Sequence, residues 1–264
     1  MSMEYVLVFG ASGGIGKEFC IQLANRGENL VISGRCKNKL ELLKDELLSI
    51  NGNISIIILP LNLESSQERV DGYKKLKDLG VLVKGLYYVS GIDTRKPFCK
   101  YDEDKIIKQA RVNFEGALST TEFALKNRAE SLEIMVVSSA CGLTPMPYFS
   151  EYSATKSALI YFYKGLKREL KGQKVKITVL CPGSVPTRKD IVEDIESQGL
   201  TGRLSKKPPE YIVKVGLKAL NKNKTVCIPG LYNKVVAFLS KITPYFIQSH
   251  VIAKKFKDKE KDAF

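Results

Sequence analysis

The chain has 264 residues, 44% of them hydrophobic and 27% charged, and this balance excludes a disordered chain, a collagen-like repeat and a disulfide-dense miniprotein. Its 42 basic and 28 acidic residues give a formal net charge of +14, which favours anionic ligands without selecting among phosphates, nucleic acid and acidic lipid. The six cysteines form no CxxC pair and one histidine is present, so we expect no metal site and a reduced, cytoplasmic setting.

Short apolar runs alternate with longer amphipathic stretches along the first 230 residues. The apolar runs predict strands over residues 5–9, 29–33, 54–61, 85–89, 132–138, 175–180 and 225–228. The amphipathic stretches predict helices over residues 14–26, 39–50, 65–79, 104–128, 151–171 and 208–221. Continuously apolar strands that alternate with helices indicate a parallel sheet covered on both faces. We therefore expect one α/β domain, with a Rossmann-like, doubly wound sheet in three layers.

Two segments fall outside this alternation. Residues 188–208 are polar and contain glycine, and we expect them to form a mobile lid over the substrate. Residues 231–264 form an extension that is first apolar and aromatic and then rich in lysine. Two interpretations of the extension stay open. It either folds over the pocket as a C-terminal cap or forms an oligomer contact, or it lies on an anionic membrane surface as a peripheral contact.

A glycine-rich turn follows the first predicted strand, and a helix follows the turn. Backbone without side chains can approach a phosphate closely, and the N-terminus of the helix presents N–H groups to it. Its position at the first strand-to-helix turn favours nucleotide binding over a plain structural turn. The residues expected to contact the nucleotide here are Gly10, Ser12, Gly13, Gly14, Ile15 and Gly16.

The end of the second predicted strand bears on the choice of cofactor. It reads Ser33-Gly34-Arg35, where a fold selective for NAD offers an acidic residue to the ribose 2′-hydroxyl. The first acidic residue downstream is Glu41, which lies inside the next predicted helix. The Arg35 guanidinium can instead pair with a 2′-phosphate. The sequence therefore favours NADP(H), and a solvated Arg35 without a ligand is the alternative.

Four polar residues suggest proton-transfer chemistry. Tyr152 and Lys156 stand four residues apart on one face of a predicted helix. A nearby ammonium lowers the pKa of a phenol from about 10, which would make Tyr152 a usable general acid and base. Ser139 follows the fifth strand, so it lies at the same sheet edge, where its hydroxyl can bond a substrate oxygen. Asn113 sits inside a predicted helix, which is unfavourable for asparagine and indicates a local use.

In this order and spacing, these pieces resemble the classical branch of the short-chain dehydrogenase/reductase family over residues 4–230. The resemblance implies an oxidoreductase that interconverts a carbonyl and an alcohol by hydride transfer with NADP(H). It implies that Ser139 orients the carbonyl and that Tyr152 transfers the proton. Lys156 would bind the nicotinamide ribose and lower the pKa of Tyr152, and Asn113 would help to hold a water.

The resemblance also implies cofactor contacts outside the glycine turn, including a PGSVPT segment that supports the nicotinamide. These residues are Asn62, Leu63, Ser90, Gly91, Pro182, Gly183, Val185 and Thr187. Three positions depart from the family pattern. Phe9 replaces a usual Thr, Tyr88-Val89-Ser90-Gly91 replaces Asn-Asn-Ala-Gly, and Asn62 replaces an Asp. An Asn62 amide oxygen can still accept from the adenine amino group, and no departure touches the proton-transfer residues.

The loop before Tyr152 is mostly apolar and predicts one wall of the substrate pocket. Its candidate contacts are Cys141, Met146 and Tyr148, which join Ser139 and Tyr152. An apolar or lipid-like small molecule is therefore favoured as substrate. The resemblance further implies a homodimer or homotetramer. A non-catalytic NADP(H)-sensing or scaffold protein is the alternative function, and no aromatic–basic motif supports nucleic-acid binding.

Overall fold

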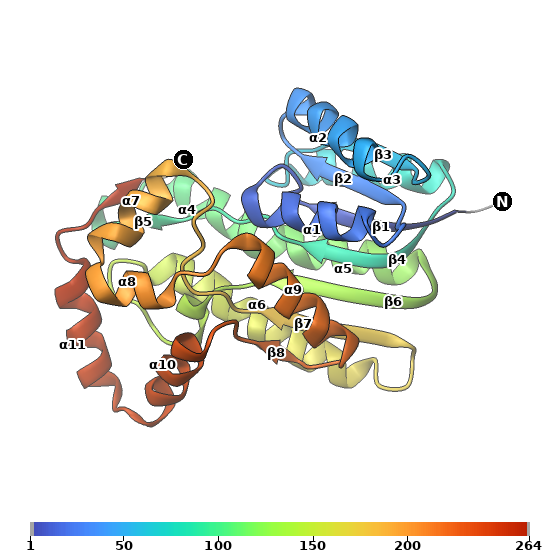
Figure 1. The fold of residues 1–264 in the computed structure, drawn as a ribbon. Coiled ribbons are helices and arrows are strands. Elements are labelled where there is room, and N and C mark those ends of the chain that lie inside the picture. Colours follow the sequence, from blue (N-terminus) through green and yellow to red (C-terminus); the bar gives the residue numbers. More distant parts are fainter. Residues whose placement is uncertain (1–2, 263–264) are drawn as a thin grey trace.

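A parallel sheet of seven strands forms the centre of the computed structural model, which describes residues 3–262. The strand order is β3-β2-β1-β4-β6-β7-β8 (Figure 1). The strands of this sheet are β1 Met3–Phe9, β2 Leu30–Gly34, β3 Ile56–Pro60, β4 Val81–Tyr88, β6 Arg128–Val137, β7 Val175–Leu180 and β8 Val226–Cys227. The order reverses between β1 and β4, which is the topological switch point of a doubly wound, Rossmann-like sheet. The predicted fold class is confirmed.

Helices cover both faces of the sheet. One face carries α1, α2 and α9, and the other carries α3, α5 and α6. The helices are α1 Gly14–Ala24, α2 Lys37–Ile50, α3 Ser66–Asp78, α4 Glu103–Ala110, α5 Gly116–Lys126, α6 Ser150–Glu169, α7 Lys189–Ser197, α8 Gly199–Ser205, α9 Pro209–Asn221, α10 Leu231–Ile242 and α11 Tyr245–Phe256. Short 3-10 turns lie at Phe98–Lys100 and Ala140–Leu143.

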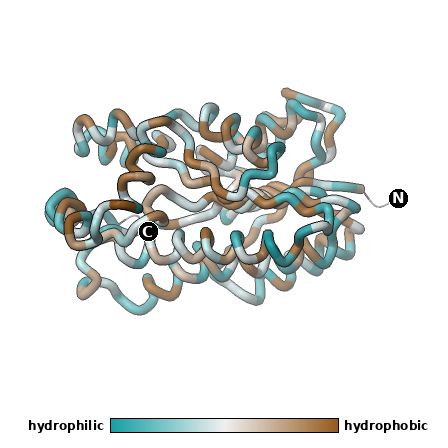
Figure 2. Tube along the Cα trace, turned by 90° about the horizontal axis from the view of Figure 1, so that it is seen from below, coloured by the Kyte–Doolittle hydropathy of each residue, from teal (hydrophilic) through white to brown (hydrophobic). Residues whose placement is uncertain are grey.

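The first strand shows how the sequence builds two cores. Leu7 and Phe9 pack into the core on the side of α5 and α6, whereas Val6 and Val8 pack on the side of α1 and α9. All four side chains are buried, because helices cover both faces. This burial explains why the strand reads as a continuous apolar run rather than as an alternating one. Figure 2 shows hydrophobic stretches along the central strands.

The long helix predicted over residues 104–128 is interrupted. A π-helical turn, Arg111–Glu115, separates α4 from α5, and Asn113 is fully buried within it. A π-turn inserts one residue into the helical repeat and is common at functional sites. The next strand, β6, begins at Arg128 rather than at residue 132, because Arg128 already pairs with Val83 of β4. The predicted boundary between this helix and strand is therefore wrong by four residues.

Beyond residue 187, the helices α7, α8, α10 and α11 gather at the carboxyl ends of the strands, whereas α9 and β8 belong to the sheet and its cover (Figure 1). The segment predicted as a lid holds the helices α7 and α8, and the extension holds α10 and α11. The chain then returns as β9, Lys261–Asp262, which pairs antiparallel with β5, Thr94–Arg95, in the loop after β4. Within residues 3–262, no helix combines the length and the apolar character needed to cross a membrane.

Candidate active site

The glycine turn between β1 and α1 has no room for a side chain at Gly10, Gly14 or Gly16. A Cβ atom on Gly16 would lie 2.0 Å from the carbonyl oxygen of Gly10, and one on Gly14 would lie 2.6 Å from the Thr187 side chain. Gly10 has a φ of +83°, which only glycine adopts without strain. No acidic residue occupies the first turn of α1. Bare backbone at a helix N-terminus suits a pyrophosphate.

One cavity of about 1000 Å³ runs along the carboxyl edge of the sheet and begins at this turn. The turn residues predicted from the sequence all line it: Gly10, Ser12, Gly13, Gly14, Ile15 and Gly16. The other predicted cofactor residues line it too: Arg35, Asn62, Leu63, Ser90, Gly91, Tyr152, Lys156, Pro182, Gly183, Val185 and Thr187. The structure thus brings the predicted cofactor contacts together along one surface.

The end of this cavity beside β2 and β3 has basic residues on one wall. Arg35 and Lys39 are exposed there at the end of β2 and the start of α2. The loop after β3 forms another wall, in which Asn62 Oδ1 accepts a hydrogen bond from the Glu64 N–H at 3.2 Å. The acidic side chain of Glu64 also lines the cavity and lies 3.9 Å from Lys108. The cavity is therefore lined here by two exposed basic residues and by one acidic residue that pairs with Lys108.

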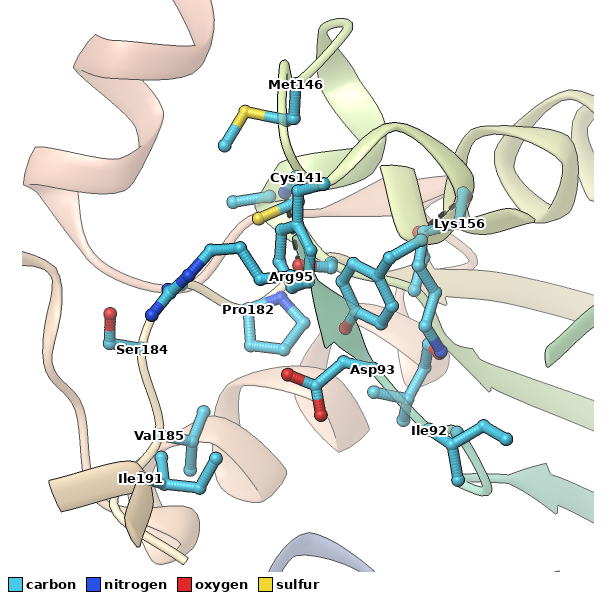
Figure 3. Close-up of a pocket in the computed structure, with 18 of the residues that line it drawn as sticks. Ile92, Asp93, Arg95, Cys141, Met146, Lys156, Pro182, Ser184, Val185 and Ile191 are labelled. Carbon is cyan, nitrogen blue, oxygen red and sulfur yellow. Dashed lines mark hydrogen bonds between the residues drawn. The ribbon is translucent and has the colours of Figure 1, made fainter. Parts of the chain in front are cut away.

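The proton-transfer residues meet at the carboxyl end of β6. The Ser139 hydroxyl accepts from the Cys141 N–H at 3.1 Å and is hydrogen-bonded to the Tyr152 hydroxyl. Lys156 is buried and donates from Nζ to the Val137 carbonyl at 3.0 Å. Its Nζ lies 5.7 Å from the centre of the Tyr152 ring. Figure 3 shows Lys156 and Cys141 facing the cavity with Asp93 and Pro182.

Burial sets the protonation of this cluster. It raises the pKa of Tyr152 above the ordinary value, the Asp93 carboxylate acts in the same direction, and the hydrogen bond with Ser139 opposes them. Burial also lowers the pKa of Lys156 to about 8, although Asp93 raises it. The lowering of the Tyr152 pKa by the Lys156 ammonium stays a prediction, because burial dominates the pKa of Tyr152 in this structure. The phenol is protonated at neutral pH, which is the form that donates to a carbonyl oxygen.

Asn113 is buried behind the cavity wall and is not among the residues that line the cavity. Its Oδ1 accepts from the Ile92 N–H at 2.8 Å, and its Nδ2 donates to the Ile92 carbonyl at 2.9 Å and to Thr155 Oγ1 at 3.1 Å. These bonds hold the loop after β4 against α6. A Cβ atom on Gly91 would lie 2.8 Å from Lys156 Nζ, so this loop passes close to the ammonium. The role of Asn113 in holding a water stays a prediction.

The apolar wall of the substrate side differs from the prediction at one position. Cys141 and Met146 line the cavity as expected. Tyr148 is not among the lining residues in the described part of the chain, and its backbone turns with a φ of +64°. Phe149 occupies the wall instead, with its ring stacked on that of Tyr152 at a centroid distance of 4.5 Å. The aromatic side chain on this wall is therefore that of Phe149 and not that of the preceding residue, Tyr148.

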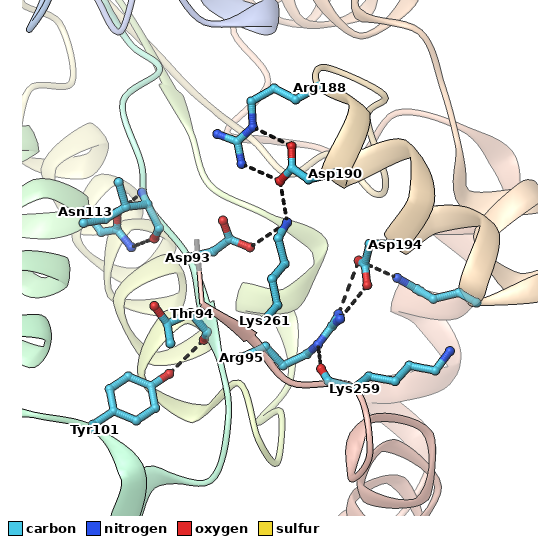
Figure 4. A network of polar contacts seen from close by, with 12 residues as sticks. Asp93, Thr94, Arg95, Tyr101, Asn113, Arg188, Asp190, Asp194, Lys259 and Lys261 are labelled. Atoms are coloured by element: carbon cyan, nitrogen blue, oxygen red, sulfur yellow. Dashed lines mark hydrogen bonds and ion pairs between the residues drawn. The ribbon is translucent and has the colours of Figure 1, made fainter. Parts of the chain in front are cut away.

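Sequence reasoning missed an ionic network at the cavity mouth, which Figure 4 shows. Arg95 is buried and binds both carboxylate oxygens of Asp194, at 2.5 and 3.3 Å, while its Nε donates to the Lys259 carbonyl at 2.6 Å. The loop after β4, helix α7 and the C-terminal segment are therefore joined at one guanidinium. No spacing rule links these residues, because only the fold brings them together.

A second part of the network centres on Lys261 in β9. Its Nζ lies 3.8 Å from Asp93 and 3.4 Å from Asp190 (Figure 4). Asp190 also accepts two hydrogen bonds from Arg188 at 3.0 Å, and this arginine holds the pKa of Asp190 at about 2. Asp93 is the carboxylate that acts on both Tyr152 and Lys156. The end of the chain is thus connected by charge to the proton-transfer residues.

Helices α10 and α11 form the outer wall of the cavity. Val236 and Leu239 of α10 line it, as do Ile247 and Val251 of α11. The Thr144 hydroxyl donates to Gln248 Oε1 at 2.7 Å, which ties α11 to the loop that carries the apolar wall. The extension beyond residue 230 therefore covers the substrate side of the cavity.

A doubly wound parallel sheet, a glycine turn at its first crossover and a buried Tyr–Lys pair at the same edge define a dinucleotide-dependent oxidoreductase. A sequence model of the short chain dehydrogenase family matches residues 4–197, and the chain belongs to this family. Enzymes of the family use NAD(P)(H) and act on CH–OH or C=O groups.

Known relatives show which lipid-related proteins the chain is similar to. It is 28% identical over 235 residues to a very-long-chain 3-oxoacyl-CoA reductase of Neurospora crassa, which covers 86% of this chain and 68% of that protein. It is 26% identical to rat 17-beta-hydroxysteroid dehydrogenase type 3, over 91% of this chain and 76% of that protein. Against several other fungal reductases, the chain spans only 52% to 54% of their length.

Among solved structures, the fold is similar to that of a 7beta-hydroxysteroid dehydrogenase. The TM-score is 0.84 and the match covers 95% of this chain and 96% of that one. The sequence identity is 22%, so this likeness concerns the fold alone.

Proposed function

We propose that the protein is an NADP(H)-dependent oxidoreductase that interconverts an apolar, lipid-like carbonyl and its alcohol, with Tyr152 as general acid and base. One observation carries the proposal. The Ser139–Tyr152–Lys156 cluster stands where the glycine-lined half of the cavity meets the apolar half. A ligand on each side would therefore meet at Tyr152, whose hydroxyl can transfer a proton.

The residues present fit NADP(H). The glycine turn supplies bare backbone for the pyrophosphate, as the short Cβ distances at Gly14 and Gly16 show. Arg35 is exposed on the cavity wall at the end of β2, where its fork of donors suits a 2′-phosphate. When bound, the nicotinamide supplies or accepts the hydride. The choice of NADP(H) over NAD(H) rests on Arg35.

In the reducing direction, Tyr152 donates its proton to the carbonyl oxygen. The Ser139 hydroxyl can donate a second hydrogen bond to the same oxygen and so orient the carbonyl. Lys156, whose pKa is about 8, is mostly an ammonium at neutral pH and favours the phenolate that proton transfer leaves behind. In the oxidising direction, the phenolate takes the proton back from the alcohol.

The substrate class follows from the wall opposite the cofactor residues. Cys141, Met146 and Phe149 line this side, and apolar residues of α10 and α11 close it. The relatives named for 3-oxoacyl-CoA reduction and for 17-beta-hydroxysteroids support a lipid-like substrate. Both names describe substrates with a carbonyl or alcohol on a large apolar body.

The test is the variant Tyr152→Phe, which keeps the ring and removes the transferable proton. We expect turnover of NADPH with a panel of steroid ketones and 3-oxoacyl thioesters to fall about 10²- to 10⁴-fold. The dissociation constant of NADPH should stay unchanged, and Tyr211→Phe on α9 serves as the matched control. Unchanged turnover in Tyr152→Phe would exclude this role. NADPH binding by the parent without turnover of any ketone would instead favour the non-catalytic sensing protein.

A further inference from the structure

The outer surface of α10 and α11 exposes an unusual amount of apolar side chain. Ten of the large hydrophobic residues between 231 and 256 are exposed, among 21 in the described part of the chain. These ten are Leu231, Val235, Val236, Phe238, Leu239, Ile242, Tyr245, Phe246, Ile247 and Val251. We call the surface they form the apolar hairpin face. A contiguous exposed apolar patch marks an interaction site.

Helix α10 presents a regular stripe to solvent. Leu231, Val235, Phe238 and Ile242 recur at helical spacing, and their exposed fractions are 77%, 47%, 63% and 64%. The opposite side of the helix, with the buried residue Ala237, packs onto the protein. The helix therefore packs onto the fold through Asn233 and Ala237 and carries on its other side an apolar stripe that the fold does not use.

The charge of this region has a single sign. Residues 231–257 contain five lysines and neither aspartate nor glutamate, in a chain with 28 acidic residues. Lys234 and Lys241 are exposed on α10, on the side of the helix next to its apolar stripe. Lys254 is exposed on α11, one turn beyond Val251. Basic side chains therefore border the apolar hairpin face.

The apolar hairpin face is continuous with the active-site cavity. Four residues belong to both, since each lines the cavity and is also 44% to 61% exposed: Val236, Leu239, Ile247 and Val251. They consequently form the rim through which the apolar half of the cavity reaches the surface. Whatever covers the apolar hairpin face lies at the entrance for the substrate.

We propose that the apolar hairpin face docks on an anionic lipid bilayer surface and that the cavity opens toward that bilayer. Apolar residues at the level of the acyl chains, bordered by lysines at the level of the headgroups, are the pattern of an interfacial amphipathic helix. A second copy of this chain fits less well, because a two-fold contact through this face would bring lysines of the same sign together. The proposal concerns binding to a surface and does not depend on the proposed reaction.

The experiment is sedimentation of the full-length protein with vesicles of phosphatidylcholine alone or mixed with phosphatidylglycerol. We expect binding to the mixed vesicles, much weaker binding to neutral vesicles, and loss of binding as salt rises. Failure to bind the mixed vesicles at low salt would overturn the proposal. Equal binding to both vesicles would overturn the assigned role of the lysines.

Two pairs of variants separate the apolar and the basic contributions. Phe238→Asp with Phe246→Asp should abolish binding to mixed vesicles, whereas Leu42→Asp, on an equally exposed position of α2, should not. A lysine near an anionic surface contributes roughly fivefold, so Lys241→Glu with Lys254→Glu should weaken binding at least about 30-fold. Lys74→Glu with Lys171→Glu makes the same change of charge elsewhere and should have little effect.

A second copy as the occupant gives a different result. Analytical ultracentrifugation would then show self-association that Phe238→Asp with Phe246→Asp abolishes, and the mixed vesicles would not compete for the same face. That outcome would overturn the proposal. Turnover of a soluble ketone by the same variants should match the parent, which separates the loss of docking from damage to the reaction site.

Discussion

The two halves of the cavity are built by different means. The cofactor half is built around the glycine turn. A Cβ added to Gly16 would lie 2.0 Å from the Gly10 carbonyl oxygen, so a larger residue does not fit at this position. The substrate half is assembled from the loop before α6 and from segments after residue 187, and it is held by ion pairs such as Arg95–Asp194. The first half depends on excluded volume within one turn, whereas the second depends on charges that meet across the fold.

Gly16→Ala should disrupt the cofactor half of the cavity, although it adds only one carbon atom. The added Cβ cannot avoid the Gly10 carbonyl unless the turn moves, and overpacking of this kind costs up to about 3 kcal/mol. If the distortion falls on the bound state, the dissociation constant of NADPH rises about 100-fold. Calorimetric titration would measure it. Gly165→Ala in α6, where a Cβ meets nothing within 4 Å, is the control, and equal affinities in the two variants would contradict the argument.

Arg35→Ala should affect the cofactor half selectively. A charge-assisted hydrogen bond to a 2′-phosphate contributes roughly 1.5–3 kcal/mol, so NADPH should bind about 10- to 100-fold more weakly. NADH has no 2′-phosphate and should lose little. The measurement is the dissociation constant of both cofactors at fixed ionic strength, with the exposed Arg26→Ala as control. Equal losses for both cofactors would show that Arg35 is a solvated residue without a role in selection.

This contrast also explains what could be predicted from the sequence. The glycine turn and the Tyr152–Lys156 pair are local patterns, so their spacing placed them on the correct elements. The π-turn around Asn113 carries no separate signal, because its residues continue a helical pattern. Within this turn Asn113 is hydrogen-bonded to Ile92, a residue of the loop after β4, and such a contact between distant segments leaves no local pattern in the sequence. Tyr148 was expected on the cavity wall because it belongs to the mostly apolar loop before Tyr152. The sequence gives no sign of the positive φ at this residue.

The ionic network at the mouth of the substrate half could not be predicted from local patterns. Asp93, Arg95 and Lys261 come from segments far apart in the sequence, and each alone resembles an ordinary surface charge. Their positions depend on the short ladder between β5 and β9, which two residues in each strand form. The apolar and basic composition of the extension suggested both a cap and a membrane contact. The described structure shows its inner side on the cavity, and the outer side is the subject of the docking proposal.

Arg95→Met should break the substrate half and spare the cofactor half. Removal of the guanidinium leaves Asp194, whose side chain is 20% exposed, without its main partner. Loss of one partner of a buried pair costs about 3–5 kcal/mol, and the partial exposure of Asp194 reduces this to about 2–3 kcal/mol. Urea unfolding would measure the loss, and NADPH affinity should hardly change.

The control for this prediction is Lys174→Met. It removes an exposed ion pair with Glu130, whose side chains are 65% and 81% exposed, and such pairs contribute about 0–1 kcal/mol. A similar loss of stability in both variants would contradict the view that Arg95 holds the mouth together. A large loss of NADPH affinity in Arg95→Met would show that the two halves are coupled.

The smallest expected effect concerns Glu151, at the start of α6. Neither of its buried carboxylate oxygens has a hydrogen-bond partner in the described residues, and burial raises its pKa from 4.5 to about 7. The folded protein therefore holds this proton more tightly than the unfolded chain, so the group lowers stability as pH rises from about 4.5 to 7. Glu151→Gln should raise the melting temperature above pH 7 and leave it unchanged near pH 4. The exposed Glu130→Gln should change neither, and parallel pH profiles for parent and Glu151→Gln would refute the assignment.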